Sequence, residues 1–447
     1  MFNGLATKLS RRTTSRSPSA IRRSCSTTKL HAQFNPNPVA LQMIDYAFSL
    51  SRSHKSDESY AQGLLVLQQC ESIQHDGDSK GLVLLAISTL FSERGNFVGA
   101  IEKLNKINQL NVACFPLRVA AMEALAGLHL ELEEDDASSV IADDCLKDLD
   151  AMKPELGYGF GLLDARVRAL KGLIELGRAK TCFEGVENNL GTGKFLQLSS
   201  PVMCIRTPPP YSCHIGEISY KKDIILLNIG NGALSYAEFL HATRDFSTAK
   251  QLYQNLIKGI PESIDYSDPY NLAAGNMARD DILMAATCAL GQLESHMGNF
   301  EDAEKILTRA LTLTEERFGP HHPKMGIILT CIALMFRHKA TAERSSSLMV
   351  QEGLYRRALE LLKAPQLDTE VKQEAKVYGK DIVALARGGY AETLCVQQNR
   401  KAVGEQMKNW AEAAWKNQRL SLSEALDISS NPGSKIPVID ARISRAF

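Results

Sequence analysis

Apolar residues recur every three or four positions along most of the chain between residues 38 and 417. This spacing gives an α-helix one apolar face, so it predicts a long succession of amphipathic helices. Short polar breaks separate the helical stretches, as at Arg94-Gly95-Asn96 and Met297-Gly298-Asn299. Because short connections make neighbouring helices pack antiparallel, the pattern predicts an all-α chain built from helical hairpins.

Small and bulky residues follow a repeated order within these hairpins. Two helices that cross at close range need a small residue at the crossing and a bulky residue beside it. The clearest unit spans residues 284–313, and two further units place similar residues at corresponding steps. The three sets are Leu290, Gly291, Gly298, Phe300, Ala303, Leu307 and Ala310; Tyr236, Ala237, Leu240, Phe246, Ala249, Tyr253, Leu256 and Pro261; and Ser88, Phe91, Gly95, Phe97, Ala100 and Leu104. The repetition predicts stacked units that cover one another's apolar sides.

The repeated units resemble the tetratricopeptide family, and residues 284–363 are similar to the longer repeats of kinesin light chains. The resemblance rests on the run from Gly298 to Glu304, on Arg309-Ala310-Leu311 and on the link from Phe318 to Pro323. It implies an α-solenoid of antiparallel helical hairpins with a tetratricopeptide-like superhelix. Ala249 and Ala303 lie 54 residues apart, whereas a regular array repeats about every 34 residues. The difference predicts longer helices or inserted loops.

The pattern divides the chain into five parts. We expect a leading segment over 1–37, an N-terminal helical array over 38–190, an irregular insert over 191–230, a C-terminal array over 231–420 and a tail over 421–447. The insert contains three consecutive prolines from Pro208, which forbid a helix there. For the tail we expect a loop or short helix over the last hairpin, where it would shield the apolar end of the solenoid.

The balanced charge of 51 basic and 51 acidic residues conceals a basic start. No acidic residue precedes Asp45, whereas seven Lys and Arg residues lie there among many Ser and Thr residues. This composition predicts a mitochondrial presequence, with the matrix as destination, a cut after Cys25, and a plastid as the alternative. Removal of residues 1–25 would leave 45 basic residues against 51 acidic ones. A disordered basic tail is the other interpretation.

Motifs for chemistry are incomplete in this chain. Gly191-Thr192-Gly193-Lys194 lacks the leading glycine and the following Ser or Thr of a phosphate-binding loop. Cys204, Cys213 and His214 supply three ligands where a structural zinc site needs four. The longest apolar runs are shorter than the roughly 20 residues that span a bilayer. We therefore expect no enzyme activity, no cofactor, no metal and no transmembrane segment; a hydrolase or transferase site within 191–230 is the alternative.

A solenoid of this kind offers its concave face for binding, and the first helix of each unit lines that face. Counting from the aligned small residues predicts a protein-binding groove formed by Glu238, His241, Gln292, Ser295, His296, Arg337 and His338. Glu238 and Gln292 stand where peptide-carboxylate clamps of the resembled family have Asn, which argues against that clamp.

The predicted function is a non-enzymatic scaffold or assembly factor that binds other proteins in mitochondria. A respiratory complex subunit or a chaperone is the expected kind of partner, by family analogy. The alternative is an organellar RNA-binding helical-repeat protein. The acidic mature chain and its irregular repeats favour protein over nucleic acid as the partner. The sequence does not predict the oligomeric state.

Overall fold

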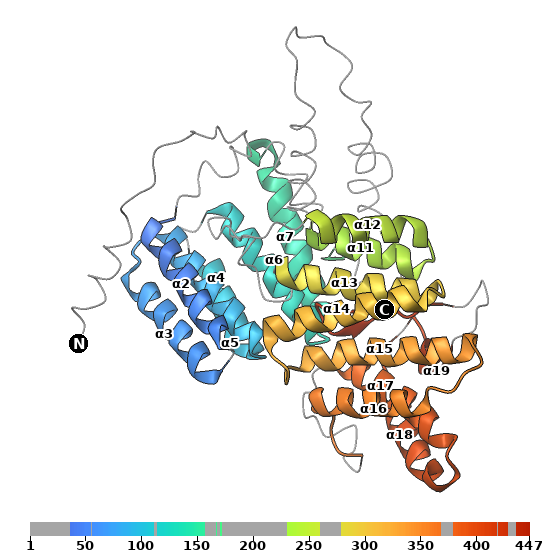
Figure 1. Cartoon of the computed structure of the whole chain (residues 1–447). Coiled ribbons are helices and arrows are strands. Elements are labelled where there is room, and N and C mark those ends of the chain that lie inside the picture. Colours follow the sequence, from blue (N-terminus) through green and yellow to red (C-terminus); the bar gives the residue numbers. More distant parts are fainter. Residues whose placement is uncertain are drawn as a thin grey trace, which may run out of the picture.

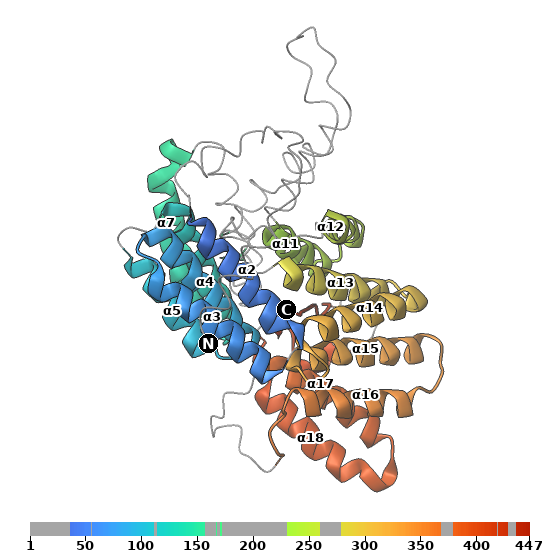
Figure 2. The same ribbon diagram turned by 60° about the vertical axis from the view of Figure 1, so that its left-hand side comes forward.

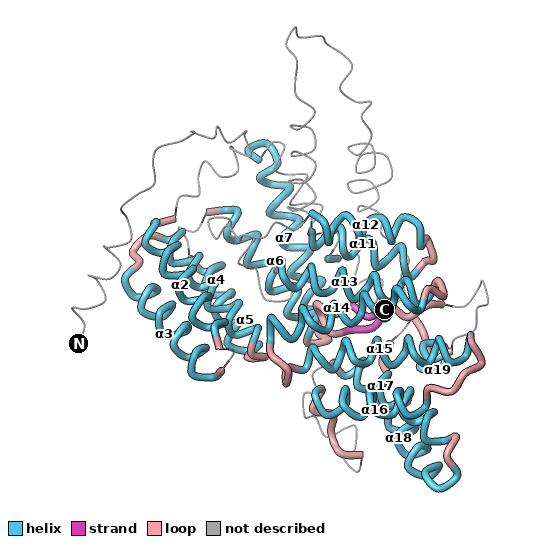
Figure 3. Tube along the Cα trace, viewed as in Figure 1, coloured by secondary structure: helices cyan, strands magenta, loops and turns pink. Residues whose placement is uncertain are grey.

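The computed structural model describes residues 36–54, 56–110, 114–156, 167, 170–171, 230–259, 279–367, 379–417, 419–427 and 435–447. Within these residues the chain forms fifteen α-helices and only two short strands, so the predicted all-α class is confirmed (Figure 1 and Figure 3). The predicted presequence, most of the predicted insert, and residues 204, 213 and 214 lie outside the described residues.

Consecutive helices pack as antiparallel hairpins, and successive hairpins stack on one another within residues 38–156 and within residues 230–414, which makes the described part of the chain an α-solenoid. The seven hairpins in that part are α2 (Pro38–Ser53) with α3 (Asp57–Ile73), α4 (Gly77–Glu93) with α5 (Phe97–Gln109), α6 (Phe115–Glu131) with α7 (Asp135–Leu156), α11 (Gly230–Ala242) with α12 (Phe246–Gly259), α13 (Arg279–His296) with α14 (Phe300–Phe318), α15 (Pro323–Ala342) with α16 (Leu348–Leu361), and α17 (Lys380–Cys395) with α18 (Lys401–Ala414).

The predicted turns at Gly95 and Gly298 are confirmed, and both residues have positive φ, 72° and 82°. The amide of Gly298 donates to the carbonyl of Ser295, and the next amide donates to Glu294. This pair of bonds satisfies carbonyls left free at the helix end and requires a left-handed residue. Arg244 has the same conformation at the end of α11. The turn therefore recurs even where glycine is absent.

The predicted close crossing of α13 and α14 is confirmed. A Cβ on Gly291 would lie 2.6 Å from Cγ of Leu307, so only glycine fits there without a shift. Ala303, Leu307 and Ala310 on the facing side of α14 are all buried. The small and bulky positions that the sequence singled out are thus the ones that set the helix spacing.

The long interval between Ala249 and Ala303 arises between hairpins. The helix α12 ends at Gly259 and α13 begins at Arg279, so the additional residues fall in 260–278, outside the described residues. The helices α13 and α14 are also long, at 18 and 19 residues. Of the two expected causes, longer helices contribute through α13, and the expected inserted loop falls on residues outside the described ones.

The helix α15 is long and apolar enough to cross a membrane by length and composition, and it is the one such helix among the described residues. However, 56% of its apolar window is buried inside the protein, where it packs against α14, α16 and α17. Core helices of solenoids pass the same test, so this feature is weak evidence for a membrane span.

The early and late hairpins meet through Glu93 at the end of α4. Its carboxylate pairs with Arg52 of α2 at 2.6 Å and with Arg317 of α14 at 2.9 Å. Burial would raise the pKa of Glu93, but these two guanidinium groups lower it overall. His322 caps the N-terminus of α15 and contacts the Glu93 carbonyl through Nε2 at 3.2 Å. Figure 2 shows α2–α5 beside the helices α13–α18.

The tail differs from the prediction in its second half. The short helix α19 (Leu422–Leu426) packs on α17, as expected for a segment over the last hairpin. Residues 435–447 instead turn inward and form a hairpin of β1 (Ile439–Asp440) and β2 (Arg445–Ala446) among the first helices of the late units (Figure 3). Nearly all of this segment is buried. It fills the inner face because its apolar side chains complete the core there.

Candidate functional site

The seven residues predicted to line a groove lie on the first helices of three consecutive late hairpins. Glu238 and His241 belong to α11, the residues Gln292, Ser295 and His296 to α13, and Arg337 and His338 to α15. The structure brings them together on one inner surface, although Glu238, His241, Gln292 and Ser295 are buried rather than solvated. Their adjacency is as predicted, and their binding of a partner stays a prediction.

Three of these residues form a histidine row across the inner surface. Nε2 of His241 lies 2.8 Å from Nδ1 of His296, which makes a hydrogen bond between the two rings. The ring of His338 follows with its centroid 6.3 Å from that of His296, and its Nδ1 lies 3.5 Å from Oγ of Ser295. Polar side chains of α11, α13 and α15 are therefore in contact from one helix to the next.

The histidine row is uncharged at neutral pH. Burial lowers the pKa of His241 well below its usual value, and neighbouring His296 and Arg419 lower it further. Burial, His338 and Arg244 lower the pKa of His296 to about 3. A protonated imidazole here would lack water and face other cations. The rings therefore act as neutral hydrogen-bonding groups.

The tail binds the inner surface through a buried arginine. Nη2 of Arg442 donates to Oε2 of Glu238 at 2.7 Å and to Oδ2 of Asp440, in its own hairpin, at 2.7 Å. All three side chains are buried. Burial and the neighbouring Asp440 raise the pKa of Glu238, with Arg442 opposing them. One guanidinium group thus lies between two carboxyl groups, Glu238 on α11 and Asp440 in the tail itself.

The remaining bonds from the inner surface go mainly to the tail backbone. Gln292 both accepts from the amide of Ile439 and donates to its carbonyl, each at 2.9 Å. Nζ of Lys324 donates to the Arg442 carbonyl at 3.2 Å, and Asn417 donates to the Ala446 carbonyl at 2.7 Å. A side-chain amide used in this way mimics a neighbouring strand. The surface thus binds a β-hairpin, with Arg442 in the turn.

Sequence reasoning missed the tail as part of the site. Its signal was a short alternation of apolar and polar residues from Ile439 to Ser444, which is typical of a strand. In the structure these residues form β1 and the turn of the hairpin. Asp135, in an acidic stretch of α7, pairs with Arg445 and so holds the tail from the opposite side. No local pattern relates positions 310 residues apart.

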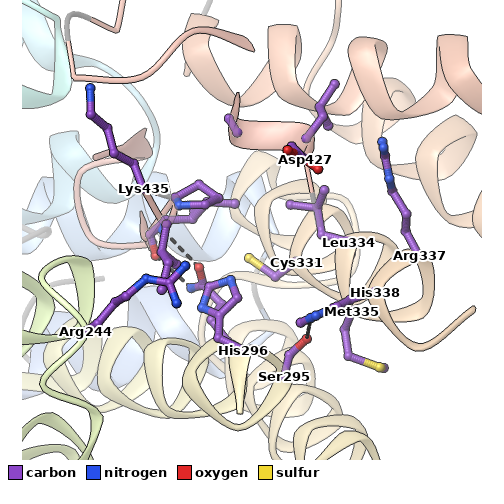
Figure 4. A pocket seen from close by; sticks show the side chains of 16 residues that line it. Arg244, Ser295, His296, Cys331, Leu334, Met335, Arg337, His338, Asp427 and Lys435 are labelled. Atoms are coloured by element: carbon purple, nitrogen blue, oxygen red, sulfur yellow. Dashed lines mark hydrogen bonds between the residues drawn. The ribbon is translucent and has the colours of Figure 1, made fainter. Parts of the chain in front are cut away.

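The tail leaves one part of the inner surface open as a cavity of about 220 Å³ (Figure 4). It lies between the inner surface, α19 and the first residues of the tail. Five of the seven residues of the predicted groove line it: Gln292, Ser295, His296, Arg337 and His338. The other lining residues are Arg244, Cys331, Leu334, Met335, Ala425, Leu426, Asp427, Lys435, Ile436, Pro437 and Ile439. Eight of these sixteen residues are polar or charged and eight are apolar, a mixture that suits binding of a side chain or small molecule.

The cavity residues are already engaged in structural contacts. Arg337 pairs with Glu392 of α17, and Nζ of Lys435 donates to the Arg419 carbonyl at 2.6 Å. Cys331 lies with its sulfur 3.6 Å from that of Cys288, and burial raises the pKa of Cys331. A protonated buried thiol is a poor nucleophile. The arrangement therefore favours binding through shape and hydrogen bonds.

No family model matches this sequence, and no curated protein matches it as a relative. A functional proposal for this protein therefore rests on its fold and on the geometry of its inner surface.

Proposed function

We propose that this protein is a non-enzymatic scaffold or assembly factor of the tetratricopeptide type, which binds segments of other proteins on the inner face of its solenoid. The observation that carries the proposal is the way in which the inner surface binds residues 435–447. Gln292 holds both backbone groups of Ile439, and other inner side chains hold further carbonyls of the tail. A surface that binds the backbone of one hairpin segment in this way is suited to bind others.

Mitochondria, and the matrix in particular, are the proposed location, with a plastid as the alternative. The support is the acid-free, Arg-rich start of the sequence. Import of the radiolabelled full chain into isolated mitochondria tests it, with Arg22→Gln and Arg23→Gln together as the variant. We expect a protease-protected, shortened product from the natural chain and much less from the variant. Equal import would contradict the proposed presequence.

The open cavity is the proposed entry point for a partner segment, and a subunit of a respiratory complex or a chaperone is the kind of partner we propose. Leu334 lies half-buried on its wall. A Leu334→Trp substitution would fill the cavity, whereas Met349→Trp on α16, where Met349 is 82% exposed, would leave it open.

Proximity labelling in mitochondria tests this proposal directly. We expect a defined set of labelled proteins with the natural chain, at least fivefold less of them with Leu334→Trp, and no loss with Met349→Trp. Absence of any specific labelled protein would overturn the scaffold proposal. Tight, salt-sensitive retention of single-stranded RNA on filters would replace it with the RNA-binding alternative.

A further inference from the structure

The inner surface contacts the tail in two different ways. Gln292, Lys324 and Asn417 bind backbone groups, which every polypeptide offers at the same positions. Glu238 instead binds the side chain of Arg442, and Oγ of Ser235 lies 3.2 Å from the same guanidinium nitrogen. The contacts therefore fit the backbone of a hairpin and select an arginine at one position, in its turn.

The arginine position is a built site on α11. Glu238 is fully buried, and its second carboxyl oxygen, Oε1, has no hydrogen-bond partner within the described residues. Arg442 is the largest of the fully buried side chains there. A carboxyl group that is buried with one unused oxygen is costly without a cation beside it. Any segment that replaces the tail must therefore supply such a cation.

We propose that the inner surface is a receptor for a hairpin-forming partner segment with an arginine in its turn and aliphatic residues on either side, and that residues 435–447 are a resident competitor which this segment displaces. The inference rests on the proposed function and names the chemistry of its partner. Seven residues, 428–434, tether the tail to the α19 region. A short tether gives the tail a local concentration of about millimolar. A free partner segment must bind tightly enough to compete with this local concentration of the tail, so the tail excludes weak ligands.

The contacts of the tail also indicate which residues of the partner segment matter. The tail places aliphatic side chains at Val438, Ile439 and Ile443 around the arginine, and all three are buried. Ile439 and Ile443 belong to the main core cluster, together with residues of the late hairpins. A partner segment needs the arginine for selectivity and these aliphatic groups for affinity.

The test uses the full chain with a specific protease site placed between Asp427 and Lys435, cut after folding. A fluorescent peptide with the sequence of residues 435–447 is then added, and its anisotropy is followed. We expect saturable exchange of the peptide into the cut protein and at least 100-fold weaker binding to the uncut protein. An Arg442→Gln peptide should bind at least tenfold more weakly than the natural one. A peptide of scrambled order should not bind.

Each contrary result has a distinct meaning. If the cut tail stays bound and no exchange occurs within a day, the tail is a permanent part of the core and the inference is wrong. Equal binding of the natural and Arg442→Gln peptides would remove the arginine selectivity. If exchange fails but Leu334→Trp still abolishes labelling of partners, the scaffold proposal stands and only the resident-competitor inference fails. If labelling finds no partner while exchange succeeds, the scaffold proposal fails instead.

Discussion

At the scale of single residues, backbone conformation decides the turns of the solenoid. Gly298 has φ of 82°, and no atom lies within 4 Å of where its Cβ would be. We expect Gly298→Ala to lower the free energy of unfolding by about 1 kcal/mol, because a side chain disfavours this conformation even without a clash. Thermal unfolding followed by circular dichroism measures the effect.

A matched glycine provides the control. Gly353, within α16, also has no atom near its Cβ position, and its φ is not positive. Gly353→Ala should raise stability by up to about 1 kcal/mol, because alanine favours a helix. If the free energy of unfolding falls in Gly298→Ala and rises in Gly353→Ala, backbone conformation rather than lack of space sets the cost of the added side chain. The same sign at both would contradict it.

The buried histidines make a second prediction at the residue scale, on the dependence of stability on pH. The pKa of His296 is about 3 in the folded protein against an ordinary value of 6.5. Below pH 6.5 the unfolded chain binds a proton that the folded chain does not, so stability falls as pH falls from 6.5 toward 3. The expected loss from His296 is about 2 kcal/mol at pH 5.

Replacement of the histidine isolates this effect. His296→Gln should reduce the difference in stability between pH 7 and pH 5, since glutamine does not titrate. His75→Gln, at an exposed position, serves as the control. Urea unfolding at both pH values measures the change. An unchanged dependence in His296→Gln would mean that this ring is protonated or exposed in solution.

At the scale of elements, the spacing of α13 and α14 depends on Gly291. An added Cβ would lie 2.6 Å from Cγ and 2.8 Å from Cδ2 of Leu307. We expect Gly291→Ala to cost about 1–3 kcal/mol through overpacking, and Leu307→Ala to cost about 2–5 kcal/mol through a cavity. The double variant should cost less than the two changes added, because alanine at 291 enters the space left by Leu307. Additive costs would contradict this contact.

At the scale of the whole molecule, Glu93 and Arg317 join hairpins that are 224 residues apart in sequence. The Arg317 side chain is 10% exposed and also pairs with Asp280 and Asp281. We expect Arg317→Ala to cost about 3 kcal/mol, since it leaves partly buried carboxylates without their cation. Hydrogen exchange should accelerate in both α4 and the α14–α15 region.

A surface arginine gives the comparison for this whole-molecule effect. Arg357 pairs with Glu360 on the exposed side of α16, so Arg357→Ala should cost less than about 1 kcal/mol. If Arg317→Ala accelerated exchange only in α14, the early and late hairpins would be energetically independent. Exchange in both regions would show that the solenoid behaves as one cooperative unit.

The sequence by itself determined the features that depend on neighbouring residues. The spacing of apolar residues predicted the helices, Gly95 and Gly298 predicted the turns, and Gly291 predicted the close crossing; all are present. The repeated positions also predicted which side chains would share the inner surface, so the His241–His296 contact follows from equivalent steps in consecutive hairpins. Helix periodicity and capping are local, and a linear pattern records them.

Only the tertiary structure decided what fills that inner surface. The tail enters it because Arg442 meets Glu238 from 204 positions away and Arg445 meets Asp135 from 310 positions away. Arg442 also pairs with Asp440, two residues before it, but this local contact does not reveal the distant partner. Burial of Arg442 and Arg445 is favourable only once distant helices have enclosed the hairpin and supplied opposite charges. Contacts of this kind depend on the assembled fold, so the sequence predicted a surface for binding but not its resident occupant.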